Sequence, residues 1–306
     1  MPNVNVNGNQ YFYEEKGSGF PIVFGNSLLF GHRMWDQQVE TLSSRYRCIT
    51  YDFLGHGGSS VGAEGYSLED EAENLHALMD QWGASPAHMV GLSMGGMVDM
   101  RLALAHPEDV RSLALLDTSA EEEEAERRPQ YEAMAAAARA NGPESVVDAV
   151  VPFMFSPGFQ QSQPEPVAAF RQQFIDSNID GIERATKAVT RRTSVLDKIS
   201  QIKLPTLVIV GSDDISTTPD KAQHIAEEIA GARLETIAGS GHLTAIEQPE
   251  RISQLLSEFL AQADSASPKY NRLPTYQTLS NPVTGILPDS LPIGRNPLRR
   301  AVRIPP

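Results

Sequence analysis

The residues best suited to chemistry form the segment Gly91-Leu92-Ser93-Met94-Gly95, which Gly96 follows. An apolar run precedes this segment and an amphipathic run follows it, so the pattern predicts a strand, a sharp turn and a helix. Neighbouring backbone at such a turn leaves no room for side chains at Gly91 and Gly95. The turn lifts the hydroxyl of Ser93 above the sheet and directs the Met94 N–H at a developing oxyanion. Ser93 is therefore predicted to be a catalytic nucleophile.

A serine hydroxyl needs a general base near neutral pH, and His242 is the predicted base among seven histidines. It lies in a glycine-flanked loop, Gly239-Ser-Gly-His-Leu, between the last expected strand and the last expected helix. The remaining histidines fall in helices, at a strand start or in loops. Of these, only His56, in Gly55-His56-Gly57-Gly58, is a candidate to line the site.

The base in turn needs a carboxylate that holds its tautomer and stabilises the imidazolium. Asp214, three residues beyond the end of an apolar strand at Gly211, is the predicted partner. Its neighbour Asp213 is expected to shape the loop. Asp117, at the end of the preceding strand, is a rival acid whose other interpretation is an anchor for the segment that follows.

A second oxyanion donor is expected in the loop Gly25-Asn-Ser-Leu-Leu-Phe-Gly31, which follows an apolar strand. The backbone N–H of Leu28 is the predicted donor, paired with that of Met94. A backbone donor survives any side-chain substitution, so the conformation of this loop matters more than its residue types.

Apolar strands alternate with amphipathic helices along most of the chain, which is typical of a mostly parallel, doubly wound α/β sheet covered on both faces. Strands are expected at 10–15, 21–24, 47–51, 87–92, 112–116, 205–211 and 234–237. Helices are expected at 33–44, 94–106, 219–230 and 249–262, and at 67–82, where Ser67 and Asp70 have capping-box spacing.

Residues 120–200 break this alternation, because they contain helical patterns and no strand pattern. Helices are expected at 121–139, 144–155, 166–177 and 181–192. The acidic run Glu121 to Glu124 is interpreted as the solvated first turn of a helix, where carboxylates favour the positive end of the dipole. The predicted division is a core at 1–119 and 201–264, a helical cap at 120–200 and a tail at 265–306.

The tail differs in composition from the rest of the chain. Residues 265–306 contain eight of the 21 prolines and six basic residues against one acidic residue. Their net charge of +5 leaves −19 on residues 1–264, since the whole chain carries −14. The tail is interpreted as a flexible or extended appendage.

The acidity of the chain argues against nucleic-acid partners and anionic membrane surfaces. No apolar run approaches the roughly 20 residues that span a bilayer, and residues 1–10 lack the features of a secretory signal, so a cytoplasmic location is expected. Cys48, the single cysteine, lies in an apolar run and is interpreted as a buried strand residue. No Cys/His spacing typical of a metal site occurs, and neither a metal nor a cofactor is expected.

Several segments resemble the α/β-hydrolase fold family, and within it the 3-oxoadipate enol-lactonases and related esterases. They are Asn26-Ser27-Leu28, Met34-Trp35-Asp36-x-Gln38, Tyr66-Ser-Leu-Glu-Asp70, Gly91 to Met97 and Leu115 to Ala120. The resemblance spans about 11–260 and implies a Ser-His-Asp triad, a helical cap and hydrolysis of an ester or lactone. Two positions depart from it. Leu29-Phe30 replace Gly-Thr, and Leu54 replaces the arginine of Asp-x-Arg-Gly-His-Gly.

These observations predict a serine hydrolase that cleaves a small carboxylic ester or lactone through an acyl-enzyme. Candidate pocket residues are Asn26, Leu29, Phe30, Phe153 and Phe155. An anionic substrate would need a cation such as Lys187, Arg191 or Arg192. The alternatives are a C–C bond hydrolase, a cofactor-free perhydrolase, and a non-catalytic protein that binds a small ligand on the same scaffold. The sequence makes no prediction about oligomeric state.

Overall fold

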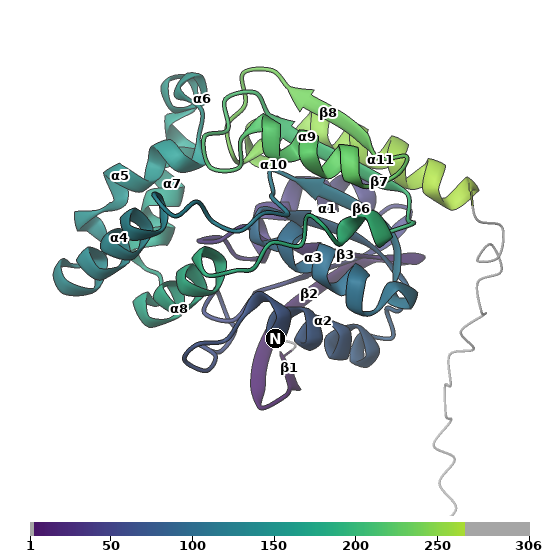
Figure 1. Cartoon of the computed structure of the whole chain (residues 1–306), viewed down its shortest axis with the longest axis horizontal. Coiled ribbons are helices and arrows are strands. Elements are labelled where there is room, and N and C mark those ends of the chain that lie inside the picture. Colours follow the sequence, from purple (N-terminus) through teal and green to yellow (C-terminus); the bar gives the residue numbers. More distant parts are fainter. Residues whose placement is uncertain (1–2, 267–306) are drawn as a thin grey trace, which may run out of the picture. The chain divides into compact units, whose positions relative to one another are not determined.

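The computed structural model describes residues 3–266, whose helices and strands are arranged around an eight-stranded sheet (Figure 1). The strand order is β1-β2-β4-β3-β5-β6-β7-β8. The pairs β1·β2 and β2·β4 are antiparallel, and every other pair is parallel. The strands are β1 Asn3–Val6, β2 Asn9–Gly17, β3 Phe20–Gly25, β4 Tyr46–Tyr51, β5 Ala87–Leu92, β6 Val110–Leu116, β7 Thr206–Gly211 and β8 Arg233–Ile237.

Helices cover both faces of this sheet because its central strands are apolar on both sides. In β7, Val208 and Val210 belong to the core beneath α2, α3 and α9, whereas Leu207 and Ile209 belong to the opposite core beneath α1 and α11. These helices are α1 Asp36–Leu42, α2 Leu68–Trp82, α3 Met94–Ala105, α9 Pro219–Glu228 and α11 Pro249–Ser265, and the short α10 spans Thr244–Glu247. The alternating arrangement expected from the sequence is confirmed.

Several local signals also have the structure that their residues predict. Ser67 Oγ accepts a hydrogen bond from the backbone N–H of Asp70, and the Asp70 carboxylate accepts one from the backbone N–H of Ser67. The helix expected at 33–44 instead begins as a 3-10 turn, His32–Trp35, before α1. The strand β1 and the helix α10 were not predicted, because both are too short for a clear periodicity.

The order of the strands determines where side chains can converge. The chain passes from β3 outward to β4 and then returns to β5 on the other side of β3, so the direction of winding reverses between β3 and β5. In parallel sheets, a crevice opens outside the carboxyl ends of the strands at such a reversal. The loops after β3 and β5 begin there, and they contain Asn26-Ser27-Leu28 and Ser93.

Between β6 and β7 the chain forms five helices, called here the inserted helices, which lie on the left in Figure 1. They are α4 Arg128–Asn141, α5 Val147–Met154, α6 Pro157–Ser162, α7 Pro164–Ile175 and α8 Ile179–Thr190. Apolar side chains of α5 and α7, including Val151 and Phe170, continue the core that α1 and α11 form with the sheet. The helix α6 was not predicted as a separate element.

The prediction for the acidic run Glu121 to Glu124 was wrong. The helix α4 begins at Arg128, with Pro129 in its first turn, where proline is well tolerated. The acidic residues precede the helix in an irregular segment and pair with other elements. Glu121 Oε1 lies 2.7 Å from His224 Nδ1, Glu123 Oε2 lies 3.0 Å from Arg192 Nη1, and Glu124 Oε1 lies 2.9 Å from Lys221 Nζ.

The appendage predicted at 265–306 lies outside the described residues apart from its first two positions. Among residues 3–266, no helix combines the length and the apolar character needed to cross a membrane.

Candidate active site

Ser93 occupies a strained turn between β5 and α3. Its φ of 54° and ψ of −112° place it outside the regions that L-residues ordinarily adopt. A Cβ at Gly91 would lie 2.5 Å from the carbonyl carbon of Gly95, and a Cβ at Gly95 would lie 2.3 Å from the carbonyl oxygen of Gly25. Only glycine fits at these two positions. The close packing presses the loop after β3 against the start of α3.

His242 and Asp214 extend from Ser93 as a continuous chain of hydrogen bonds. His242 Nε2 lies 2.9 Å from Ser93 Oγ, and His242 Nδ1 lies 2.9 Å from Asp214 Oδ2. All three residues are buried. The loops after β5, β7 and β8 supply them, so the carboxyl ends of parallel strands bring together residues 149 positions apart in the sequence.

Asp214 is held by three further donors. Its Oδ1 accepts from the backbone N–H groups of Ser216 and Thr217, at 2.8 and 3.1 Å, and its Oδ2 accepts from Thr217 Oγ1 at 2.8 Å. Burial alone would raise the pKa of Asp214, but the imidazole of His242 and these donors lower it. Burial alone would lower the pKa of His242, but the charge and hydrogen bond of Asp214 raise it. The pair therefore favours an ionised carboxylate beside a basic imidazole.

Asp117, the rival acid, accepts hydrogen bonds from a different set of donors. Its Oδ1 accepts from the Gly211 N–H at 2.9 Å, and its Oδ2 accepts from the Thr244 N–H and Oγ1 at 3.1 and 2.6 Å. Burial, and then the nearby charge of Asp214, hold its pKa well above the usual range. Asp117 therefore fastens the end of β7 to the segment after His242, rather than the start of the inserted helices.

Ser27 and Leu28, in the loop after β3, line the same cavity as Ser93. Among residues 3–266, the amides of Leu28 and Met94 donate to no acceptor. The loop is held by the Gly95 N–H, which donates to the Asn26 carbonyl at 2.9 Å, and by Asn26 Nδ2, which donates to the Tyr51 carbonyl. Through these two hydrogen bonds Asn26 ties the loop to the start of α3 and to the end of β4.

His56 supports the same loop from outside the crevice. Its Nε2 accepts from the Leu29 N–H at 3.1 Å, while its Nδ1 donates to the Leu54 carbonyl at 3.0 Å. Leu29 has a φ of 73°, so this bond holds a residue in the left-handed region. Burial lowers the pKa of His56, which favours the neutral ring that can accept this bond.

A small cavity of about 70 Å³ adjoins Ser93 and His242. The inserted helices and the segment before them supply much of its wall, including Glu123, Phe153, Met154 and Thr190. An apolar cavity of about 80 Å³ shares Leu28, Phe153 and Met154 with it and is also lined by Leu29. Of the five expected pocket residues, Phe153 lines both cavities and Leu29 the second.

Phe30 and Phe155 are placed elsewhere. Phe30 stacks on Phe170 with ring centroids 5.1 Å apart, and Phe155 contacts Phe170 edge-on. Both Phe30 and Phe155 line a separate hollow of about 260 Å³, next to α1 and α7. Neither residue lines the cavity beside Ser93 or the apolar cavity that adjoins it.

The three cations considered as anchors for an anionic substrate are paired with acids. Lys187 Nζ lies 2.7 Å from Glu183, Arg191 Nη2 lies 2.9 Å from Glu132, and Arg192 lies against Glu123. No lysine or arginine of the described residues lines either cavity beside Ser93.

Two residues that support the site were not singled out in the sequence. Thr217 Oγ1 donates to Asp214 and lies 3.2 Å from His242 Nδ1. The spacing Asp214-x-Ser-Thr is typical of a turn capped by a side chain, and it could have identified Thr217 in the sequence. Glu247 accepts from the Gly241 N–H at 3.1 Å and from the N–H and Oγ of Ser156 at 2.9 and 2.7 Å. It therefore ties the His242 loop to the start of α6.

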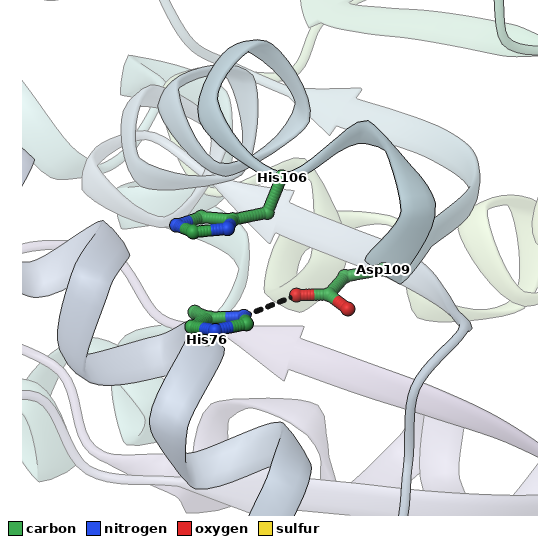
Figure 2. Close-up of side chains that lie close together, drawn as sticks. All are labelled: His76, His106 and Asp109. Carbon is green, nitrogen blue, oxygen red and sulfur yellow. Dashed lines mark hydrogen bonds and ion pairs between the residues drawn. The ribbon is translucent and has the colours of Figure 1, made fainter.

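Sequence spacing also missed a group of metal-type ligands that the fold brings together. The rings of His76 and His106 stack 3.9 Å apart, and His76 Nδ1 is hydrogen-bonded to Asp109 Oδ2 at 2.5 Å (Figure 2). His106 Nε2 lies 3.1 Å from Glu73. These contacts join α2 to the turn between α3 and β6, and none of the four residues lines the cavities beside Ser93.

Comparison with known proteins agrees with this geometry. Residues 21–249 match the family model described as alpha/beta hydrolase fold. The chain is 33% identical over 239 residues to 3-oxoadipate enol-lactonase 1 of Acinetobacter baylyi, an alignment that covers 78% of this chain and 88% of that protein.

Two solved structures are similar over most of their length. The enol-lactonase from Burkholderia xenovorans LB400 has a TM-score of 0.80 at 30% identity, covering 85% of this chain and all of its own. A thermophilic esterase from Thermogutta terrifontis has a TM-score of 0.80 at 26% identity, covering 86% and 99% of the two chains. On the matched family model and these similarities, the chain belongs to the α/β-hydrolase fold family and is a hydrolase.

Proposed function

We propose that this hydrolase cleaves a small carboxylic ester or lactone through an acyl-enzyme on Ser93. The observation that carries the proposal is the unbroken relay from Ser93 Oγ to His242 to Asp214, with both hydrogen bonds at 2.9 Å. Ser93, His242 and Leu28 line one cavity, and the backbone N–H groups of Leu28 and of Met94, the residue after Ser93, donate to no acceptor among residues 3–266. These are the parts that acyl transfer requires: a nucleophile, a base, a group that orients the base and an oxyanion site.

In the proposed reaction, His242 Nε2 takes the proton of Ser93 as Oγ bonds to the substrate carbonyl carbon. The tetrahedral oxyanion accepts hydrogen bonds from the Leu28 and Met94 amides. His242 then gives its proton to the departing alkoxide, the C–O bond breaks, and an acyl group remains on Ser93. A water molecule repeats these steps: His242 takes its proton, its oxygen attacks the acyl carbon, and the proton returns to Ser93.

The cavities favour a small and uncharged substrate. Together they provide a small space beside Ser93, lined by both polar and apolar side chains, and an apolar space beyond Phe153. The enol-lactone of 3-oxoadipate, after which the Acinetobacter baylyi relative is named, retains a carboxylate. With no lysine or arginine of residues 3–266 in these walls, a neutral ester or lactone suits this chain better.

The proposal is tested with a fluorophosphonate label and with p-nitrophenyl acetate. We expect mass spectrometry to find the label on Ser93, and we expect Ser93→Ala to abolish both labelling and turnover. Turnover that survives in Ser93→Ala, or a wild-type protein that neither labels nor turns over, would contradict it. In the second case, a ligand that raises the melting temperature without being consumed would indicate a binding protein.

Product masses separate ester cleavage from the other chemistries that this scaffold could support. An ester or lactone gains one water. A C–C bond hydrolase would instead split a carbon skeleton, and a perhydrolase would form a peracid when hydrogen peroxide is supplied. We expect the first pattern, with the products of the other two absent.

A further inference from the structure

We propose that Glu123 selects substrates carrying a neutral hydrogen-bond donor, a hydroxyl or an amide N–H, a few bonds from the scissile carbonyl. This inference rests on the proposed function and specifies the substrate class. It begins from the cavity beside Ser93, which Glu123 and Thr190 both line. Glu123 was expected to be solvated, whereas the structure buries it.

The carboxylate of Glu123 is only partly satisfied by the protein. Its Oε2 lies 3.0 Å from Arg192 Nη1, but its Oε1 is buried and has no hydrogen-bond partner among residues 3–266. The hydroxyl of Thr190, on the same cavity wall, is likewise buried and without a partner in that part of the chain. A buried polar group left unpaired costs free energy, so a ligand that pairs with these groups is favoured.

The type of partner follows from the chemistry of the two groups. An ionised carboxylate can only accept hydrogen bonds, whereas a threonine hydroxyl can donate or accept. A substrate group that meets both must therefore donate to Glu123, and a hydroxyl can also accept from Thr190. An ester or lactone without a donor leaves both groups unpaired.

The charges around Glu123 indicate that the substrate group that pairs with it is neutral. Arg192 already neutralises Glu123, and it is anchored by two further bonds, to the carbonyls of Glu121 at 2.8 Å and Val189 at 2.8 Å. Arg192 is not among the residues that line the cavity. A substrate carboxylate would meet the carboxylate of Glu123, and no lysine or arginine of residues 3–266 lines this cavity to bind it.

The position of the donor follows from the size of the cavity. Ser93, His242 and Glu123 line one space of about 70 Å³, so a substrate whose carbonyl reaches Ser93 has only a few bonds to span before it reaches Glu123. A donor on the carbon next to the carbonyl meets this requirement. An apolar substituent can extend past Phe153 and Met154 into the adjoining cavity of about 80 Å³.

Three γ-butyrolactones test the inference: one with an α-hydroxyl, one with an α-methyl of nearly the same size, and one with an acetate side chain. We expect the wild-type kcat/KM to favour the α-hydroxy over the α-methyl lactone by roughly tenfold or more, since a hydrogen bond to a charged group is worth about 1.5–3 kcal/mol. The acetate-bearing lactone is expected to be the poorest of the three.

Glu123→Gln is the decisive variant. Its amide oxygen can keep the bond from Arg192, which turns the NH₂ group toward the position of Oε1. We expect the preference for the α-hydroxy over the α-methyl lactone to fall to about threefold or less. Glu122→Gln makes the same chemical change at the exposed neighbouring position and is expected to keep the wild-type preference. Thr190→Val is expected to reduce the preference by a smaller factor.

Equal losses for both lactones in Glu123→Gln, or no wild-type preference, would overturn the inference and leave Glu123 as a structural partner of Arg192. If Glu123→Gln fails to fold, the wild-type ratio and Thr190→Val still decide. Turnover of p-nitrophenyl acetate distinguishes a failure of the inference about Glu123 from a failure of the proposed function. If this ester is cleaved through Ser93 but the lactones show no preference, only the selection by Glu123 fails. If Ser93 is inert, the proposed function fails as well.

Discussion

Replacement of Asp214 by asparagine should remove nearly all turnover, because the donors around Asp214 determine how the asparagine amide is oriented. Oδ1 accepts from two backbone N–H groups, of Ser216 and Thr217. In Asp214→Asn the amide oxygen must occupy that position, because an NH₂ group there would face two donors. The NH₂ group is then left opposite His242 Nδ1, 2.9 Å away in the unmodified protein.

This arrangement reverses the tautomer of the imidazole. Nδ1 must accept from the new NH₂ group, so the ring proton moves to Nε2, which faces Ser93 and can no longer take its proton. The negative charge that stabilises the imidazolium is lost at the same time. The cost for such a change is roughly 10⁴ in rate, or about 5 kcal/mol of transition-state free energy.

Asp117→Asn is the matched control, because Asp117 is an equally buried acid whose hydrogen bonds go to Gly211 and Thr244. We expect it to lower the melting temperature while kcat/KM of the folded protein falls less than tenfold. The assay is p-nitrophenyl acetate turnover, with a melting curve for each variant. The reasoning is refuted if Asp214→Asn retains a tenth of the activity, or if Asp117→Asn loses as much as Asp214→Asn.

Three further predictions follow from the contacts described above. The pKa of His242 is raised, and the base must be neutral to act, so the acid limb of the kcat/KM–pH profile should have its midpoint above the usual imidazole value of about 6.5; a midpoint below 6 would contradict this. His56→Ala removes the acceptor of the Leu29 N–H and the donor to the Leu54 carbonyl. It should lower the melting temperature and lower kcat/KM of the folded protein by up to roughly 10²-fold; unchanged kinetics would show that the loop keeps its conformation without this bond. Burial raises the pKa of Glu71, which accepts a hydrogen bond from the Tyr11 hydroxyl, to about 7. As the pH rises, the unfolded chain loses this proton at a lower pH than the folded protein does, so roughly 3 kcal/mol of the free energy of unfolding is lost between about pH 4.5 and 7. Urea unfolding should show this loss in the wild type and not in Glu71→Gln.

Local sequence was most informative where short-range chemistry decides the structure. The strand at Ala87–Leu92 and the helix that follows it were predicted nearly to the residue, because an apolar run, a glycine-rich turn and an amphipathic run leave few alternatives. The capping pair Ser67 and Asp70 marked the start of α2 for the same reason. The prediction that His242 and Asp214 would lie near Ser93 needed only the rule that parallel strands end at one edge.

The sequence did not show which side chains from distant parts of the chain pair with one another. The run Glu121 to Glu124 has the composition of a solvated helix start, but its partners lie up to about a hundred residues away, on α9 and just beyond α8. The same holds for His76, His106 and Asp109, which share no spacing that would mark them as neighbours.

From the sequence alone, then, the fold class and the three residues of the relay could be predicted, since both follow from local periodicity and from turn geometry repeated at strand ends. Tertiary structure alone decided what surrounds the relay: that Asn26 and His56 hold the loop of Leu28, that Phe30 packs on Phe170, and that Glu123 lines the cavity. Such placements depend on which distant side chain satisfies each buried polar group. That choice is made when the elements pack, and no single stretch of chain encodes it.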